Sequence, residues 1–154
     1  MSTTANVIDE LNGILADATV FYYKLHHFHW NVKGEHFFTL HEKFEELYNE
    51  WANIIDDVAE RILELGGVTL PSLSVCLTQT SIKEASAAPQ DHRQMVQATV
   101  DDVHAQRARM LKAQLVAQEA KDKTTENILD QFVDKSAQHV WMLNAFLGKT
   151  ASEK

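Results

Sequence analysis

Apolar side chains recur every three or four residues over four long stretches of this chain, and this spacing limits its possible folds more tightly than any other feature. The stretches span about residues 5–33, 37–65, 90–120 and 124–147. Such a spacing places the apolar side chains on one face of an α-helix. With only 5 glycines and 2 prolines among 154 residues, the composition also favours helices over a turn-rich β fold. We therefore predict an all-α fold in one domain over residues 1–154, with short tails at about 1–5 and 148–154.

The connection between the second and third helices decides the predicted topology. Residues 68–91 contain both prolines and many serines and threonines, which is typical of a connecting segment. Ser72 can act as an N-cap and Ser81–Glu84 matches a capping box, so we predict a short helix within this crossover. A long crossover favours a ferritin-like four-helix bundle whose helices run up, down, down and up. The alternative is a simple up-down-up-down bundle, although antiparallel neighbours need only short loops.

The charge and the cysteine content limit the partners and the compartment. A formal charge of −8 and a pI near 5.4 provide no general attraction to nucleic acid or anionic lipid, and favour a cation as the ligand. Cys76 is the only cysteine, which excludes an internal disulfide and fits a reducing compartment. The sequence contains no apolar run of bilayer length, and its first residues lack the features of a signal peptide. We expect a cytoplasmic protein without membrane contact.

Two polar pairs lie on the second predicted helix. His41 and Glu45 are four residues apart, as are Asp56 and Glu60, and all four side chains fall broadly on one side of the helix. Along one straight axis, however, His41 and Asp56 would be roughly 22 Å apart, too far for a common metal or substrate. His29 occupies a position on the first helix where the spacing predicts an apolar residue. Either the pairs are unrelated, or something brings them together.

The two pairs are placed symmetrically about the midpoint between Glu50 and Trp51. His41 and Glu60 lie equally far from that point, and so do Glu45 and Asp56. An antiparallel copy of the helix would therefore set His41 against Glu60 of the partner subunit, as in a C₂ dimer. Each dimer would hold two sites, each combining imidazoles and carboxylates from both chains. Such a mixed ligand set suits iron and other first-row divalent metals.

Other interpretations of the same residues stay open at this point. Acidic pairs four residues apart also occur on solvated helix faces that bind nothing. The usual di-iron signature within one bundle, Glu-x-x-His on two helices, is absent, and only Asp101 and His104 come near it. We therefore expect no di-iron centre within a single chain. Three further histidines close in sequence are not included among the predicted ligands: His26, His27 and His36.

The string HWNVKGEHFFTLHEKFEELY, followed by DDVAERILELGG and the closing HVWMLNAFLG, resembles the Dps family of mini-ferritins. The resemblance implies a ferritin-like bundle assembled as a hollow dodecamer, with ferroxidase centres at the two-fold dimer interfaces. Carried over by motif, His29, His41 and Glu45 would be ligands from one subunit, and Asp56 and Glu60 from its partner. Position 45 is often Asp in this family, so the longer Glu can change the occupancy of the second iron position.

The same resemblance implies an activity and its substrates. The protein would oxidise Fe(II), with hydrogen peroxide or oxygen as the oxidant, store ferric mineral in the shell and so protect against oxidative damage. Zinc and other divalent metals would fit the same site. Trp30 resembles a family tryptophan that intercepts stray oxidising equivalents, with simple packing as the alternative. Asp122, Glu126, Asp130 and Asp134 form an acidic stripe that is either a solvated face or, in a cage, the lining of an iron entry pore.

Compaction of DNA is the second activity associated with this family, and it is the alternative function. The first 23 residues contain no Lys or Arg, and the predicted C-terminal tail offers only Lys149 and Lys154. Because basic side chains drive DNA binding by releasing counterions, we expect no DNA binding.

Overall fold

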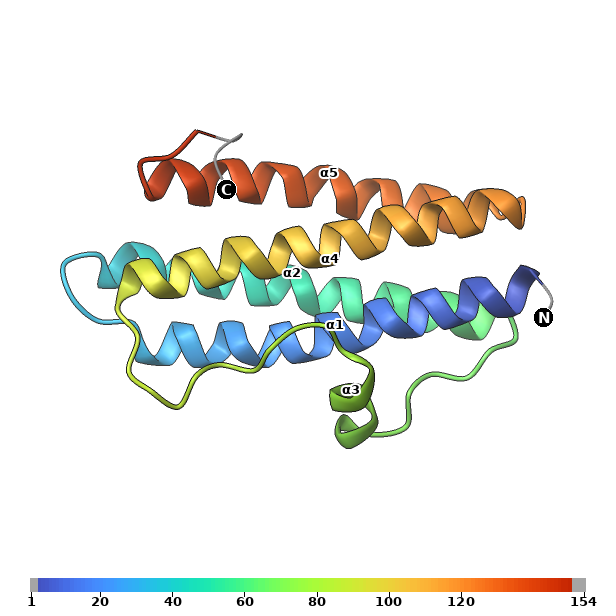
Figure 1. Cartoon of the computed structure of the whole chain (residues 1–154), viewed down its shortest axis with the longest axis horizontal. Coiled ribbons are helices and arrows are strands. Elements are labelled where there is room, and N and C mark those ends of the chain that lie inside the picture. Colours follow the sequence, from blue (N-terminus) through green and yellow to red (C-terminus); the bar gives the residue numbers. More distant parts are fainter. Residues whose placement is uncertain (1–2, 151–154) are drawn as a thin grey trace.

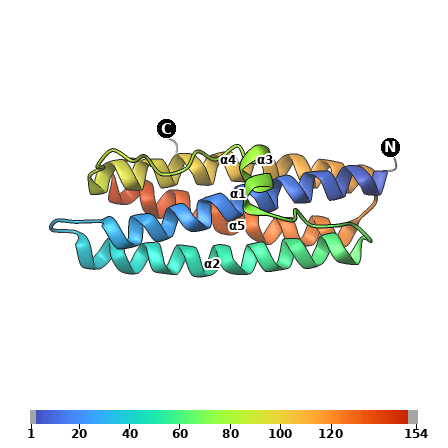
Figure 2. The same ribbon diagram turned by 90° about the horizontal axis from the view of Figure 1, so that it is seen from below.

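The computed structural model describes residues 3–150 and contains four long helices packed as a bundle (Figure 1). The helices are α1 (Thr3–Asn31), α2 (Phe37–Glu64), α3 (Leu73–Gln79), α4 (His92–Glu119) and α5 (Lys123–Phe146). α1 and α5 run in one direction, and α2 and α4 run in the other (Figures 1 and 2). The predicted order of up, down, down and up is confirmed, and the simple up-down-up-down alternative is wrong.

The helix boundaries lie within two residues of those predicted. The short helix in the crossover is also present as α3, and its N-cap is Ser72, whose side chain accepts a hydrogen bond from the Val75 N–H. The predicted capping box at Ser81–Glu84 is wrong. Ser81 begins no helix, because its N–H and its hydroxyl both donate to the carboxylate of Asp17. None of the helices between residues 3 and 150 has the length and apolar character needed to cross a membrane.

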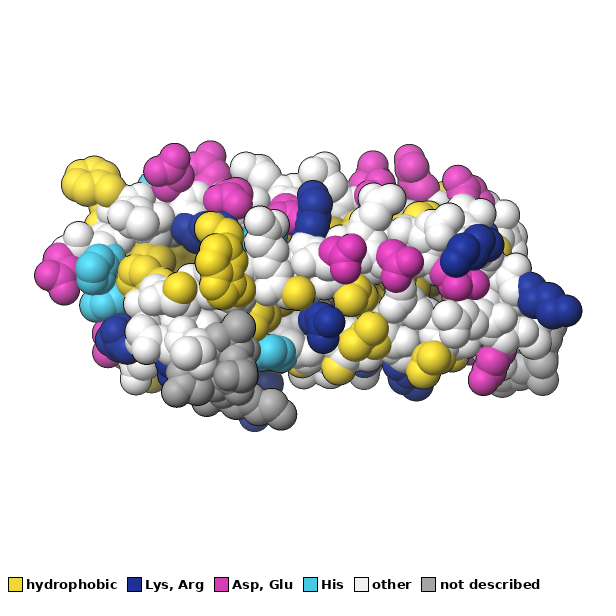
Figure 3. Space-filling view, turned by 90° about the horizontal axis from the view of Figure 1, so that it is seen from above, with side chains coloured by type: hydrophobic (Ala, Val, Ile, Leu, Met, Phe, Trp, Pro, Cys, Tyr) yellow, Lys and Arg dark blue, Asp and Glu magenta, His cyan; other side chains and the backbone are white. Residues whose placement is uncertain are grey.

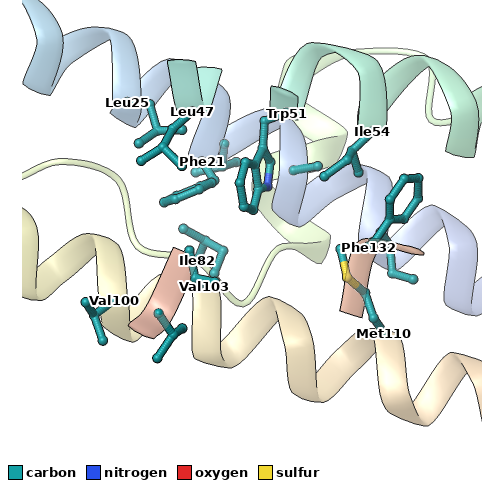
Figure 4. Close-up of a cluster of buried hydrophobic side chains, with 14 of the residues drawn as sticks. Phe21, Leu25, Leu47, Trp51, Ile54, Ile82, Val100, Val103, Met110 and Phe132 are labelled. Atoms are coloured by element: carbon teal, nitrogen blue, oxygen red, sulfur yellow. The ribbon is translucent and has the colours of Figure 1, made fainter. Parts of the chain in front are cut away.

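The apolar faces of the long helices meet in one core, part of which is drawn in Figure 4. Trp51 of α2 lies near its middle and is 1% exposed. Its ring meets Phe21 of α1 nearly edge-on, with centroids 4.9 Å apart. Its indole N–H donates to the Gln106 side chain of α4 at 2.8 Å, so the one polar atom of the ring is paired although it is buried. Trp51 thus joins three of the four long helices.

A buried carboxylate, that of Asp17, fastens the crossover to the bundle. Asp17 lies on α1 and is only 1% exposed. It accepts hydrogen bonds from the Thr80 hydroxyl at 2.8 Å and from Ser81, and it forms an ion pair with Arg109 of α4 at 2.8 Å. A buried charge is strongly destabilising unless such partners surround it. The chain that follows α3 is therefore held against α1 and α4.

Gly13 leaves the space through which Arg109 reaches Asp17, since a Cβ at this position would overlap the Arg109 guanidinium. A Gly→Ala change inside a helix ordinarily stabilises by roughly 0.5–1 kcal/mol. Here we expect Gly13→Ala to lower the free energy of unfolding by about 1–3 kcal/mol, because the guanidinium must move away from its partner. Urea titration followed by circular dichroism measures the change.

The Arg109→Ala background supplies the control for this prediction. Once the guanidinium is gone, the added methyl group has room, so Gly13→Ala should be neutral or stabilising there. Equal destabilisation in both backgrounds would contradict the steric explanation.

Glu50 and His139 connect α2 to α5. His139 is 5% exposed, and its Nε2 lies 2.6 Å from one carboxylate oxygen of Glu50. Lys135 approaches the other oxygen at 3.3 Å. The hydrogen bond with His139 lowers the pKa of Glu50, although burial acts in the opposite direction.

The lowered pKa of Glu50 predicts a pH-dependent contribution to stability. A carboxylate whose pKa is lower in the folded state stabilises the fold above its unfolded-state pKa, and this contribution disappears as the pH falls through the folded-state pKa. We expect Glu50→Gln to flatten the loss of unfolding free energy below about pH 5. Urea titrations across the acidic range measure this. Lys135→Gln removes only the weaker contribution of a 62% exposed side chain, so it should flatten the profile less than Glu50→Gln does. Parallel profiles for Glu50→Gln and wild type would contradict the prediction.

Candidate metal centre

Two of the predicted ligands, His29 of α1 and His41 of α2, are stacked face to face. Their ring centroids are 3.7 Å apart and the ring planes differ by 18°. The Nδ1 of His29 donates to the backbone carbonyl of His41 at 2.7 Å, and the Nδ1 of His41 donates to the carbonyl of His29 at 2.8 Å. Because a carbonyl only accepts, each neutral ring carries its proton on Nδ1 and keeps a lone pair on Nε2. This tautomer binds metal through Nε2.

The tight connection between α1 and α2 brings the two histidines together. Gly34 adopts φ +103°, a left-handed conformation that favours glycine. Its carbonyl accepts a hydrogen bond from the Phe37 N–H at 3.1 Å, which closes the turn at the start of α2. Val32 is buried beneath the turn. The chain therefore reverses within a few residues and sets the end of α1 beside the first turns of α2.

The stacked geometry limits how the two imidazoles can hold metal. A metal ion bound to an imidazole lies near the plane of the ring, about 2.0–2.1 Å from the nitrogen. The two rings are stacked, with their centroids 3.7 Å apart, and do not share a plane, so one ion cannot bind both Nε2 atoms in this geometry. The pair is instead suited to two ions side by side, at the roughly 3.5–4 Å spacing of two-metal sites.

The three predicted carboxylate ligands, Glu45, Asp56 and Glu60, are exposed along α2. Glu45 lies one turn beyond His41, whereas Asp56 lies roughly 22 Å further along the axis than His41. Residues 3–150 contain no group of three or more His, Cys, Asp or Glu side chains placed to hold a metal ion. The described chain thus brings the histidines together but leaves Asp56 and Glu60 apart from them.

The exposed face of α2 also carries two large apolar side chains that were not among the residues predicted to function. Phe38 is 84% exposed and Leu63 is 60% exposed. They lie equally far from the midpoint between Glu50 and Trp51, as the predicted ligand pairs do. At 3.6 residues per turn, Phe38 and Leu63 point within about 20° of Asp56. This shared symmetry is the sequence signal that could have identified them.

The centre of the same face is uncharged. Between Glu45 and Asp56, the residues that point within about 60° of this face are Asn49, Ala52 and Asn53. A second helix could therefore approach α2 closely at its middle without placing like charges against each other.

Asp122, the first residue of the predicted pore stripe, caps a helix. Its carboxylate accepts from the Thr125 N–H at 3.0 Å and pairs with the Arg61 guanidinium of α2 at 2.8 Å. Burial opposes ionisation, but the hydrogen bonds with Thr125 and the charge of Arg61 lower the pKa of Asp122. Asp122 therefore stabilises the start of α5 and joins it to α2.

The next two residues of the stripe also have partners within the chain. Glu126 pairs with Lys123 at 3.2 Å, and Asp130 accepts from the Gln114 side chain at 2.5 Å. In Figure 3, acidic side chains are scattered among basic and apolar ones on the face above α5. A pore function of these carboxylates remains a prediction.

Trp30 lies beside the histidine pair in sequence and is 58% exposed. Its ring is 5.4 Å from that of His26 and 6.2 Å from that of Tyr23. Packing within this chain therefore covers less than half of the side chain. Interception of oxidising equivalents by Trp30 remains a prediction.

Comparison with known proteins gives consistent results over nearly the whole chain. A ferritin-like domain model matches residues 8–152. A DNA protection during starvation protein from Brevibacillus brevis is 46% identical over 89% of this chain and 91% of its own length. The crystal structure of a Dps protein from Bacillus brevis has a TM-score of 0.93 at 44% identity, covering 96% of this chain and 98% of that chain.

A second solved structure connects this fold with metal chemistry. A Dps protein from Vibrio cholerae O1, described as a member of a broad superfamily of ferritin-like diiron-carboxylate proteins, has a TM-score of 0.91 at 34% identity. The match covers 94% of this chain and 91% of that chain.

Proposed function

The chain belongs to the Dps family of ferritin-like proteins, and from this membership we propose that it oxidises Fe(II) at centres shared between two chains and stores the ferric product inside a hollow dodecamer. The observation that carries the proposal is the His29–His41 pair. Hydrogen bonds from Nδ1 to the backbone hold each neutral ring in the tautomer whose Nε2 can bind metal. Asp56 and Glu60, which would complete the ligand set, lie far along the same helix from His41 and would reach such a histidine pair only in another chain.

A two-fold axis near the middle of α2 would complete the site. It would bring Asp56 and Glu60 of the partner subunit to the His29, His41 and Glu45 side chains of one chain. The same operation would place Phe38 against Leu63 of the partner subunit, removing two exposed apolar side chains from water. The uncharged centre of the face favours the close approach that this pairing needs. Histidine pair, carboxylates and apolar side chains thus all support one symmetry operation.

The ligand types fit the proposed chemistry. Neutral imidazoles bind Fe(II), and hard carboxylate oxygens favour the Fe(III) product. Two adjacent ions would each give one electron to one hydrogen peroxide, which takes up two protons and becomes two water molecules. Delivery of both electrons together avoids release of a hydroxyl radical; oxygen is the alternative oxidant. Zinc accepts the same ligands but has no redox chemistry, so we expect it to block the site.

Anaerobic Fe(II) titration followed by a peroxide pulse, together with sedimentation, tests the proposal. We expect particles of twelve 17.5 kDa chains that bind about two Fe(II) per chain and consume about one peroxide for every two Fe(II) ions. A monodisperse monomer that still oxidised iron at the full rate would contradict the shared centre.

For DNA, the alternative function, we predict no stable duplex complex at near-neutral pH and moderate salt. At −8 per chain, twelve chains carry −96 formal charges, which repel phosphate. Plasmid mobility in a gel, without divalent metal that could bridge acidic surfaces, measures the outcome. A retarded plasmid band under these conditions would show that the surface binds DNA despite its charge.

A further inference from the structure

The two imidazoles belong to a longer set of contacting rings. Phe37, at the start of α2, stacks on His41 with centroids 4.9 Å apart and planes 27° apart. Tyr48, two turns beyond His41 on α2, meets His29 nearly at a right angle, with centroids 5.3 Å apart and planes 89° apart. Each histidine of the pair is therefore in contact with one further aromatic ring of α2.

The Tyr48 ring is itself held firmly by α1. His26 stacks flat on it, with centroids 3.8 Å apart and planes 20° apart. Tyr22 contacts it edge-on at 6.2 Å. His26 is fixed in turn, because its Nδ1 donates to the Tyr22 carbonyl at 3.0 Å. Tyr48 is thus placed between the backbone-anchored His26 and the metal-binding His29.

The histidine pair needs such support. Each ring is tied to the backbone through a single atom, Nδ1. The χ2 torsion of histidine is broad, so this one hydrogen bond restrains the direction of Nδ1 better than the tilt of the ring. A change of tilt would move Nε2, and with it the position that a bound ion can take. The faces and edges of the rings must therefore be restrained by packing.

We propose that Tyr48 is a positioning residue for the metal centre, whose ring holds the His29 imidazole in the orientation that lets His29 and His41 each bind an ion. This inference rests on the proposed function. The contribution of Tyr48 comes from its ring, and Phe at this position should replace it.

Anaerobic titration of the assembled protein with Co(II), followed by its d–d absorption, tests this role without turnover. Wild type and Tyr48→Phe should bind two Co(II) per chain with similar affinities. Tyr48→Leu should keep the ion that His41 binds. It should bind the second ion, at His29, about 10- to 100-fold more weakly, as after loss of a residue that orients a ligand. Tyr23→Leu, at a 66% exposed position of α1, is the matched control and should behave as wild type.

Sedimentation and thermal unfolding show whether each variant assembles. If Tyr48→Leu does not, His26→Leu takes its place, because it removes the ring that holds Tyr48 and should weaken the same second ion. If the assembled Tyr48→Leu or His26→Leu variant bound Co(II) as tightly as wild type, the inference would be overturned. Equal weakening of the binding of both ions would also overturn it. An equally large loss in Tyr48→Phe would also overturn it, because the hydroxyl would then be responsible. A wild-type protein that bound no Co(II) would instead refute the shared centre, and this inference with it.

Discussion

Replacement of both His29 and His41 by Ala is expected to slow peroxide-driven Fe(II) oxidation by at least about 100-fold, since even residues that only orient a metal ligand contribute 10- to 100-fold. The variant removes both nitrogen ligands of every centre. Stopped-flow absorbance of the ferric product measures the rate. His27→Ala with His36→Ala is the matched control, because it removes two neighbouring histidines that lie outside the predicted ligand set.

Replacement of the carboxylate ligands should slow Fe(II) oxidation as strongly as replacement of the histidines, with less effect on the fold. Asp56 and Glu60 are exposed in the chain, so Asp56→Ala with Glu60→Ala should leave its unfolding free energy within about 0.5 kcal/mol of wild type. Its oxidation rate should nevertheless fall as far as that of the histidine variant. Asp57→Ala, next to Asp56 but pointing about 100° away, should retain the wild-type rate. Equal rates in the Asp56/Glu60 and Asp57 variants would refute the ligand assignment.

The second large effect is expected from Phe38. In the proposed dimer its ring packs on Leu63 of the partner subunit, and a buried aromatic anchor of this kind commonly contributes 2 kcal/mol or more, about 30-fold in the dissociation constant. Phe38→Asp should therefore dissociate the assembly at concentrations where wild type remains assembled. Sedimentation velocity over a dilution series measures this. In the chain itself Phe38 is 84% exposed, so the change should barely affect folding of the helices.

A charge exchange tests which residues face each other. Phe38→Lys alone and Leu63→Asp alone should each weaken assembly. Combined in one chain, they would set opposite charges against each other at both ends of the antiparallel contact, and assembly should partly recover. If the assembly of the combined variant were weakened by the sum of the two single effects, the two positions would not be in contact across the axis.

The four long helices could be predicted from sequence because each carries its own apolar repeat, and their topology could be predicted because the crossover between the second and third is long. The anchoring of the crossover could not. Ser81 has the local pattern of a capping box. Its N–H and its hydroxyl both donate instead to the buried carboxylate of Asp17, which lies 64 residues earlier. The capping role of Asp122 does have a local signal, because Asp before the first turn of a helix is a common N-cap. Its place in an acidic stripe pointed instead to a pore.

The candidate ligands could be proposed from the sequence, but not their detailed arrangement. The unexpected His29 in an apolar repeat and the symmetric spacing of the α2 pairs both point to a shared centre. The stacked rings and their reciprocal hydrogen bonds depend on how the turn at Gly34 sets α1 against α2, which residue spacing alone does not define. The same holds for Tyr48, which the helical repeat presents only as another apolar position.

The most direct test of the shared centre is complementation between two inactive chains. One chain carries His29→Ala and His41→Ala, and the other carries Asp56→Ala and Glu60→Ala. In a mixed dimer, one site lacks ligands from both chains, while the other site has all five. Mixed dimers verified by two different affinity tags should recover up to about half of the wild-type oxidation rate, because one of two equivalent sites is restored. If verified mixed dimers recovered nothing while both parent proteins folded and assembled, the ligands would not be shared across the two-fold axis.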